Sequence, residues 1–286
     1  MQRREFIKTS AFAAAGALAL PSFMAAGKAM KDRAIGLQLY TLRDTIPNDP
    51  KGVLQKVASF GYKELETYAY NDGKIFGLDY LEFDKYVKSL GMRVTSGHYG
   101  LNLVKDETVW KKAVADAKKT GMEYMVLPYL QEGDRKTIED YKKICGILNK
   151  AGDICNANGI RFGYHNHAFE FETVEGQIPY DVMLKELDPK KVGMEMDIFW
   201  VVNAGQDPVK YFDKYPGRFE QWHVKDMDKT DKMKNADVGT GSIDYKALFT
   251  KAKQSGMKHF YVEQETYNGA PIDAAAACIK YLKTIV

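Results

Sequence analysis

The segment GYHNHAFEF, residues 163–171, contains two of the five histidines of the chain, His165 and His167. Alternate residues of a β-strand face the same side, so these two side chains point in one direction if the segment is a strand. Imidazole is a common metal ligand, and it is also the usual general acid or base near neutral pH. The spacing therefore indicates a metal site, an acid–base pair, or a polar patch within a core strand.

Other apolar segments carry charged residues and histidines at alternate positions near their ends. These residues are Glu64 and Glu66, Glu195 and Asp197, Gln221, His223 and Lys225, and Glu263 and Glu265, with His98 at the end of a further segment. The apolar positions between them can pack under helices, so the polar positions must face a shared interior. A charge in a protein interior is costly unless it is paired or bound to a metal. We therefore expect these strand ends to converge on one site.

Eight segments with the character of strands must position these residues. They are residues 34–40, 62–67, 93–98, 123–129, 160–167, 191–197, 219–226 and 259–265. Segments of helical period lie between them, at residues 50–61, 80–91, 108–121, 137–159, 244–256 and 272–285. Most of these helices are followed by a glycine, namely Gly61, Gly91, Gly121, Gly159 or Gly256. Glycine suits the left-handed residue that ends a helix before the next strand.

Strands that alternate with helices favour parallel pairing, because parallel strands need a crossover connection. Eight such units in about 250 residues match the size of a closed (β/α)8 TIM barrel. An open doubly wound sheet is the alternative, but it normally has a glycine-rich phosphate turn after its first strand, and residues 40–49 contain no glycine. We therefore predict an α/β fold, a TIM barrel over residues 30–286, with catalytic groups at the carboxyl ends of its strands.

Three residues at neighbouring strand ends are favoured as metal ligands: Asp197, His223 and Glu263. Carboxylates and imidazoles without thiolates suit Mn²⁺, Zn²⁺, Co²⁺ or Fe²⁺, and this donor set does not choose among them. We expect one divalent ion at this site.

The other polar positions have structural interpretations beside functional ones. His98 is explained equally well as a hydrogen-bonded core residue and as a ligand. Glu64 and Glu195 lie deeper in their strands, where a structural role is expected. Glu66 lies at a strand tip, where it could contact substrate or support a ligand.

Several of these motifs resemble those of one family. They are GLQLYTLRD (36–44), GYHNHAFEF (163–171), MEMDIFW (194–200), HVKD (223–226), DVGTGSIDY (237–245) and YVEQE (261–265). Together they resemble the xylose-isomerase-like TIM barrels, the sugar phosphate isomerase/epimerase superfamily, over nearly all of the chain after residue 33. The resemblance implies a metal held by Glu, Asp, His and Glu from strands five to eight. Matched motif by motif, it implies Asp197, His223 and Glu263 as ligands, with His165 in the place of the first glutamate.

The resemblance also implies an enzyme that removes a proton beside the carbonyl of a sugar or keto-sugar, with the metal stabilising the enediolate. The candidates for base, acid or oxyanion partner are His98, His167, Lys225 and Glu170. Substrate contacts are expected from Trp200, as a platform for a sugar ring, and from Tyr40 and Glu66. The alternative reaction is β-elimination from 3-keto-glycosides, because His165 departs from the two-glutamate pattern of the epimerases.

The first 29 residues read as an export signal of the twin-arginine type, with Arg3 and Arg4 before an Ala/Leu-rich stretch. They carry four cationic residues against one acidic residue, so they account for the whole formal charge of +3. The remaining chain is about neutral and has no basic stripe for nucleic acid. We therefore expect an exported, periplasmic protein that does not bind nucleic acid and is not held in a membrane after cleavage.

Two further function classes remain as alternatives: an endonuclease and a non-catalytic sugar-binding protein. Neutral charge argues against the endonuclease, and the converging carboxylates and imidazoles argue against the binder. The sequence leaves open whether the chain assembles into a homo-oligomer.

Overall fold

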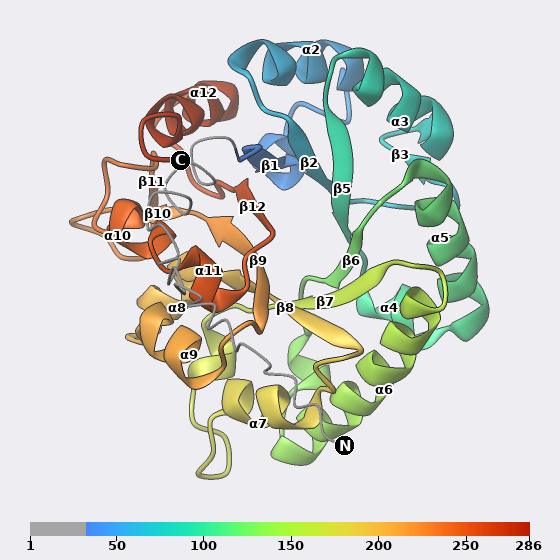
Figure 1. The fold of residues 1–286 in the computed structure, drawn as a ribbon, viewed down its shortest axis with the longest axis vertical. Coiled ribbons are helices and arrows are strands. Elements are labelled where there is room, and N and C mark those ends of the chain that lie inside the picture. Colours follow the sequence, from blue (N-terminus) through green and yellow to red (C-terminus); the bar gives the residue numbers. More distant parts are fainter. Residues whose placement is uncertain (1–32) are drawn as a thin grey trace, which may run out of the picture. The chain divides into compact units, whose positions relative to one another are not determined.

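The computed structural model describes residues 33–286, and eight parallel strands of this region close into a barrel (Figure 1). In barrel order the strands are β1 (Gly36–Gln38), β2 (Glu64–Thr67), β5 (Arg93–His98), β6 (Tyr124–Leu127), β7 (Arg161–His165), β8 (Val192–Asp197), β9 (Phe219–Val224) and β12 (His259–Val262). Pairing of β12 with β1 closes the ring. Each strand lies within one predicted segment, so the predicted TIM barrel is confirmed.

Helices surround the barrel in Figure 1. They are α2 (Pro50–Phe60), α3 (Tyr80–Ser89), α4 (Leu101–Lys105), α5 (Glu107–Thr120), α6 (Ile138–Asn156), α7 (Pro179–Glu186), α8 (Ile198–Asn203), α9 (Pro208–Lys214), α10 (Tyr245–Phe249), α11 (Ala252–Ser255) and α12 (Pro271–Leu282). Short 3-10 turns are η1 (Leu39–Leu42), η2 (Glu132–Asp134) and η3 (Phe169–Phe171). Two small antiparallel pairs lie outside the barrel sheet, β3 (Lys74–Ile75) with β4 (Leu78–Asp79), and β10 (Asp226–Met227) with β11 (Asn235–Ala236).

The predicted helix over residues 244–256 is in fact two short helices, α10 and α11. Helices α4, α7, α8 and α9 were missed, because segments of five to eight residues are too short for a clear helical period. A start signal was present, since Pro179 and Pro208 stand in the first turns of α7 and α9. The predicted stop signals are confirmed: Gly61, for example, ends α2 with a φ of +100°.

The polar strand positions face the barrel axis and the apolar positions face the helices, as predicted. On the outside, Trp222 of β9 stacks on Phe212 of α9, with ring centroids 5.1 Å apart. On the inside, the Gln221 side-chain amide donates to Ser96 Oγ at 2.9 Å across the barrel. Because of this alternation, polar side chains from several strands lie together along the barrel axis, where they form one central column.

The amino-terminal end of this column is a structural ion-pair cluster. Glu64 contacts Arg93 at 2.6 Å and His259 at 2.7 Å. Glu220 contacts Arg161 at 2.7 Å and Lys258 at 2.9 Å. The structural role expected of Glu64 is therefore confirmed, and the chemistry concentrates at the opposite end.

No helix among residues 33–286 is long and apolar enough to span a bilayer. The predicted export signal, residues 1–29, lies outside the described residues.

Candidate active site

A cavity of about 760 Å³ opens at the carboxyl ends of the barrel strands. This volume lies in the range that holds small-molecule ligands. Six of the predicted site residues line it: Tyr40, His98, His165, His167, Trp200 and Glu263. Five others are buried and are not part of its lining: Glu66, Glu170, Asp197, His223 and Lys225. The sequence therefore identified both the wall of the cavity and much of the layer of side chains behind it.

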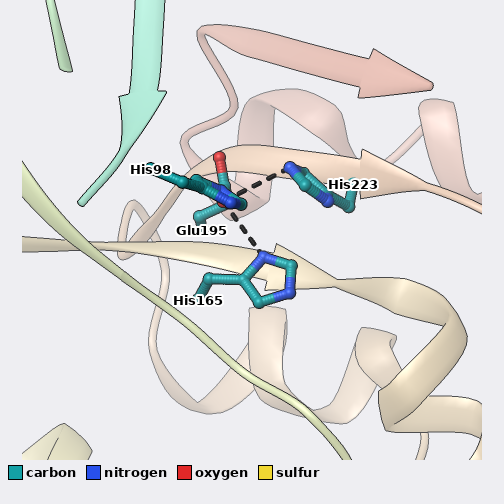
Figure 2. Close-up of side chains that lie close together, drawn as sticks. All are labelled: His98, His165, Glu195 and His223. Carbon is teal, nitrogen blue, oxygen red and sulfur yellow. Dashed lines mark hydrogen bonds and ion pairs between the residues drawn. The ribbon is translucent and has the colours of Figure 1, made fainter. Parts of the chain in front are cut away.

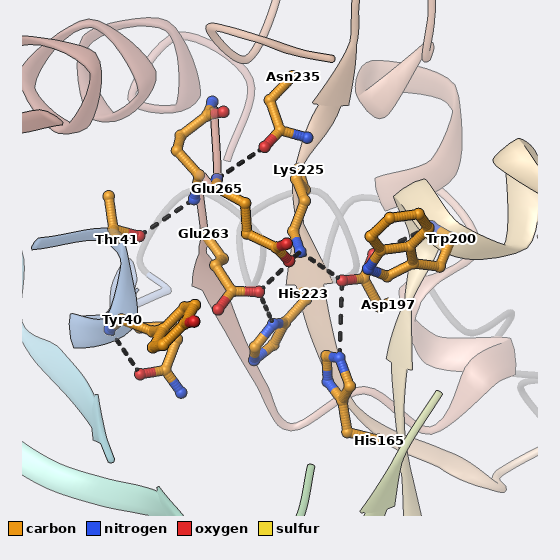
Figure 3. A network of polar contacts seen from close by, with 12 residues as sticks. Tyr40, Thr41, His165, Asp197, Trp200, His223, Lys225, Asn235, Glu263 and Glu265 are labelled. Atoms are coloured by element: carbon orange, nitrogen blue, oxygen red, sulfur yellow. Dashed lines mark hydrogen bonds and ion pairs between the residues drawn. The ribbon is translucent and has the colours of Figure 1, made fainter. Parts of the chain in front are cut away.

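The four predicted metal ligands lie together. We call His165, Asp197, His223 and Glu263 the outer donor set; the ligand atoms that they offer are all within 4.8 Å of one another. His223 Nδ1 is 3.0 Å from Glu263 Oε2, and His165 Nε2 is 3.7 Å from Asp197 Oδ2 (Figure 3). All four side chains are buried, so this is a mixed nitrogen and oxygen site of the kind that holds a divalent cation.

Lys225 forms ion pairs with both carboxylates of the outer donor set. Its Nζ lies 2.9 Å from Asp197 Oδ2 and 2.8 Å from Glu263 Oε2, and it also contacts Glu265 (Figure 3). Burial alone would lower the pKa of Lys225, but the three carboxylates raise it well above its ordinary value. Lys225 is therefore a fixed cation behind the cavity wall. Its three ion pairs argue against the role of base, and the roles of acid and oxyanion partner stay predictions.

A second group of side chains lies around Glu195, one strand position deeper. We call His98, His165, Glu195 and His223 the inner donor set (Figure 2). Glu195 Oε2 is 2.9 Å from His98 Nε2 and 3.0 Å from His165 Nδ1. A structural role was expected for Glu195, and its contacts with three imidazoles agree with that role and also make it a candidate metal ligand. The sequence indicated this position, because Glu195 lies two residues before Asp197 and both side chains therefore face the same side of the strand.

Glu66 supports these imidazoles and does not contact the cavity. Its Oε2 lies 2.6 Å from His223 Nε2 and 3.2 Å from His98 Nε2. It also accepts hydrogen bonds from Gln38 Nε2 at 2.8 Å and Ser96 Oγ at 2.6 Å. Glu66 is fully buried and has four partners. Of the two roles expected for it, the structure therefore agrees with support of a ligand and not with contact to the substrate.

His167 lines the cavity inside an aromatic column. Its ring stacks on Phe169 at a centroid distance of 5.6 Å, and Trp200 and Tyr129 lie at 5.7 Å and 4.9 Å. Its Nδ1 is buried and has no hydrogen-bond partner within residues 33–286. Burial, followed by the nearby charge of Lys225, lowers the pKa of His167 to about 3. His167 is thus a neutral imidazole at the cavity wall.

Glu170 lies behind strand β7 and does not line the cavity. The prediction that it acts on the substrate as an acid, base or oxyanion partner is therefore wrong. Tyr164 Oη donates to its Oε1 at 2.6 Å, and the backbone N–H of His167 donates to its Oε2 at 2.8 Å. Burial raises the pKa of Glu170 to about 8. Because Tyr164 is on the helix-facing side of β7, Glu170 anchors the η3 turn from outside the barrel.

Aromatic residues form much of the remaining wall. Trp200 follows Asp197 in the first turn of α8, where its backbone N–H donates to Asp197 Oδ1 at 3.2 Å. Tyr40 is 40% exposed and meets Tyr68 edge-on at 5.3 Å, so it stands at the cavity rim. The sequence prediction missed the wall residues Tyr68 and Tyr129. Their position just after strand ends was the available signal.

Comparison with known proteins agrees with this geometry. The family model described as xylose isomerase-like TIM barrel matches residues 54–285. A solved structure from Parabacteroides distasonis, described as a sugar phosphate isomerase/epimerase, is similar with a TM-score of 0.77 and 29% identity. The match covers 88% of this chain and 93% of that chain. A structure described as the IOLI protein with a binding zinc atom is similar in fold, with a TM-score of 0.67 and 18% identity, over 88% of this chain and 97% of that one.

Among curated proteins, an inosose dehydratase of Geobacillus thermodenitrificans is 25% identical over 167 residues. That match covers 51% of this chain and 55% of the relative, so the chain spans about half the length of the curated relatives it matches. The family match, in contrast, extends over most of the barrel, from α2 to the end of α12. On these grounds the chain belongs to the xylose isomerase-like TIM barrel family.

Proposed function

We propose that this protein is a divalent-metal-dependent enzyme of the isomerase/epimerase type, which removes a proton next to the carbonyl of a sugar or keto-sugar. The observation that carries the proposal is the position of His167, whose Nδ1 has no hydrogen-bond partner within residues 33–286, on the wall of the same cavity that the outer donor set lines and supports. The family and its sugar isomerase/epimerase neighbour support the substrate class.

The outer donor set fits a divalent cation on chemical grounds. Two carboxylates and two imidazoles are buried with their ligand atoms close together, which is a mixed oxygen and nitrogen donor set that suits such an ion. Zinc is named for one structural neighbour, and Mn²⁺, Co²⁺ and Fe²⁺ suit the same donors. A bound cation would polarise the substrate carbonyl and stabilise the negative charge that develops on its oxygen.

The chain's own residues supply the remaining steps. Trp200 and Tyr40 offer aromatic faces on which a sugar ring can pack, and the cavity is wide enough for one or two rings. We assign the acceptance of the proton from the carbon next to the carbonyl to His167, whose imidazole lines the cavity. His98, which also lines the cavity, is placed to return a proton or to donate to the oxyanion. Burial lowers the pKa of His98, but Glu66 and Glu195 raise it to about 9.

Elimination is the second candidate reaction, and the inosose dehydratase relatives favour it. It begins with the same proton abstraction, after which the group on the neighbouring carbon leaves with a proton from an acid such as His98. A 3-keto-glycoside would lose its aglycone in this way. The two reactions diverge only after the enediolate has formed.

The test is to follow solvent-deuterium exchange at the carbon next to the carbonyl, with free ketoses, inososes and 3-keto-glycosides as substrates. Both candidate reactions predict exchange that depends on added metal. Inversion of the carbon indicates an epimerase, and release of water or aglycone indicates a lyase.

We expect His167→Gln to slow the exchange by about 10²–10⁴-fold, the usual contribution of a general base. His259→Gln is the matched control, because it changes a buried histidine at the opposite end of the barrel. If His167→Gln exchanged deuterium at the wild-type rate, His167 would not be the base. Sugar binding without exchange by the metal-loaded protein would contradict the enzyme and favour the sugar binder.

A further inference from the structure

The inner donor set brings together three imidazole nitrogens and a carboxylate from four different strands (Figure 2). The nitrogens that face Glu195 Oε2 are His98 Nε2 at 2.9 Å, His165 Nδ1 at 3.0 Å and His223 Nε2 at 3.3 Å. Side chains of His165, Glu195 and His223 are at most 3% exposed, and that of His98 is 9% exposed. Three imidazoles with a carboxylate at one point are a donor set typical of zinc sites.

A second observation at the same place points to a ligand. The other carboxylate oxygen, Glu195 Oε1, is buried and lacks a hydrogen-bond partner in the part of the chain that the structure describes. An unpaired buried polar atom costs about 1–3 kcal/mol, more when it is charged. A cation held by this carboxylate would remove that cost. His98 and His165 also line the cavity, which gives a cation a path to the inner donors.

The two shared histidines present one nitrogen to each donor set. His165 directs Nδ1 to Glu195 at 3.0 Å and Nε2 toward Asp197 at 3.7 Å. His223 Nε2 lies 2.6 Å from Glu66 and 3.3 Å from Glu195. Its Nδ1 lies 3.0 Å from Glu263 (Figure 3).

A neutral imidazole has one nitrogen with a lone pair and one N–H. A cation at the inner nitrogens therefore leaves the outer N–H groups to donate to Asp197 and Glu263, which is the usual carboxylate–histidine–metal arrangement. A cation at the outer donor set would instead take the outer nitrogens and leave the inner N–H groups to donate to the inner carboxylate. As long as both histidines are neutral, a cation can therefore occupy only one of the two positions at a time.

The charges differ between the two positions. The outer carboxylates of Asp197 and Glu263 already share the ammonium of Lys225, which repels an incoming cation. The inner position has more nitrogen donors, which favour Zn²⁺ over Mn²⁺, whereas the carboxylate-rich outer set suits Mn²⁺ better.

We propose that the barrel has a second, deeper cation position, formed by His98, His165, Glu195 and His223, which prefers Zn²⁺ and competes with the outer donor set for the two shared imidazoles. This position has two donors of its own, His98 and Glu195, and shares His165 and His223 with the outer set on which the proposed function relies.

Paired variants of the full chain separate the two positions. Glu195→Gln and His98→Gln remove inner donors only, whereas Asp197→Asn and Glu263→Gln remove outer donors only. Each protein is stripped with a chelator, and its affinities for Zn²⁺ and Mn²⁺ are measured by competition with a chromophoric chelator and by electron paramagnetic resonance of free Mn²⁺. Thermal melting and circular dichroism establish that each variant is folded.

We expect the inner variants to lose at least about tenfold in Zn²⁺ affinity while they keep Mn²⁺ binding, and the outer variants to show the reverse. One equivalent of Zn²⁺ should weaken Mn²⁺ binding to the wild-type protein. Anomalous diffraction at the zinc edge, or X-ray absorption showing three imidazoles, should place the ion beside Glu195.

Equal losses of both metals in folded variants of both kinds would mean a single position, and would overturn the proposal. So would a zinc ion located between Asp197 and Glu263 with unchanged affinity in Glu195→Gln. Both results leave the proposed function intact, because the wild-type protein still binds a divalent cation in each case. Absence of all divalent binding by the wild-type protein would contradict both proposals.

Discussion

The carboxylate of Glu170 accepts the backbone N–H of His167 at 2.8 Å on one oxygen and the Tyr164 hydroxyl at 2.6 Å on the other. It therefore links the cavity-lining turn to the outer face of β7. A buried carboxyl in this place controls the position of His167 without reaching the substrate, and its protonation should be visible in the stability of the fold.

Glu170→Gln should become more stable relative to the wild-type protein as pH rises. The pKa of Glu170 is about 8 in the folded protein against an ordinary value of 4.5, so the folded state retains the proton to higher pH than the unfolded state. Between these two values the wild-type protein loses stability with rising pH, and glutamine does not titrate. Urea unfolding across this range measures the difference. If the difference in unfolding free energy between Glu170→Gln and the wild-type protein did not change with pH, the pKa shift would be contradicted. Tyr164→Phe is the control, because it removes the hydroxyl contact and keeps the carboxyl group.

Removal of divalent metal should abolish the proposed activity, and Asp197→Asn should lower it by at least about 10²-fold through loss of charge stabilisation. Rates are measured after chelation and after return of Mn²⁺, Zn²⁺, Co²⁺ or Fe²⁺. Asp153→Asn is the control, because it breaks only an exposed ion pair with Lys191. Full activity in the chelated protein would show that the reaction needs no cation.

Trp200→Ala should raise KM by about tenfold with a smaller change in kcat, because an aromatic platform stabilises bound substrate and transition state alike. Trp200→Phe should recover most of the affinity, since it keeps a ring beside His167. Steady-state kinetics of both variants provide the measurement. A kcat effect larger than the KM effect would instead give Trp200 a part in the chemical step.

Glu220→Gln should destabilise the fold by about 1–3 kcal/mol near neutral pH, since it removes the buried carboxylate that pairs with half-buried Arg161 and accepts a hydrogen bond from the Tyr124 hydroxyl. Burial raises the pKa of Glu220, but Arg161 and Lys258 outweigh it and hold the pKa below its ordinary value of 4.5. This stabilisation is complete above 4.5 and is lost as pH falls through the lower folded pKa. The wild-type and variant unfolding energies should therefore converge in acid. Glu107→Gln, in an exposed pair with Lys111, should change stability by less than about 1 kcal/mol.

We also propose export through the twin-arginine route, since Arg3 and Arg4 precede an apolar stretch in the undescribed N-terminal segment. Replacing both arginines by lysine in a fusion of residues 1–29 to a reporter should block its appearance in the periplasm. Equal export of both fusions would rule out the twin-arginine signal.

The barrel could be predicted because its determinants are local. Eight apolar segments, their alternation and the glycines after the helices, such as Gly121, follow from strand and helix geometry within a few residues. The short helices α7, α8 and α9 could not be predicted in the same way, because packing against the barrel rather than their own periodicity defines them.

For the site, the sequence by itself determined which residue types stand at the strand ends, and strand alternation determined that His165, Asp197, His223 and Glu263 face the barrel axis. Only the tertiary structure decided how deep each side chain lies and what it meets. Register between β7, β8 and β9 places Glu195 against His165, and the turn of η3 carries Glu170 away from the cavity. Those outcomes depend on distances between strands far apart in the sequence, and residue spacing along one strand contains no information about them.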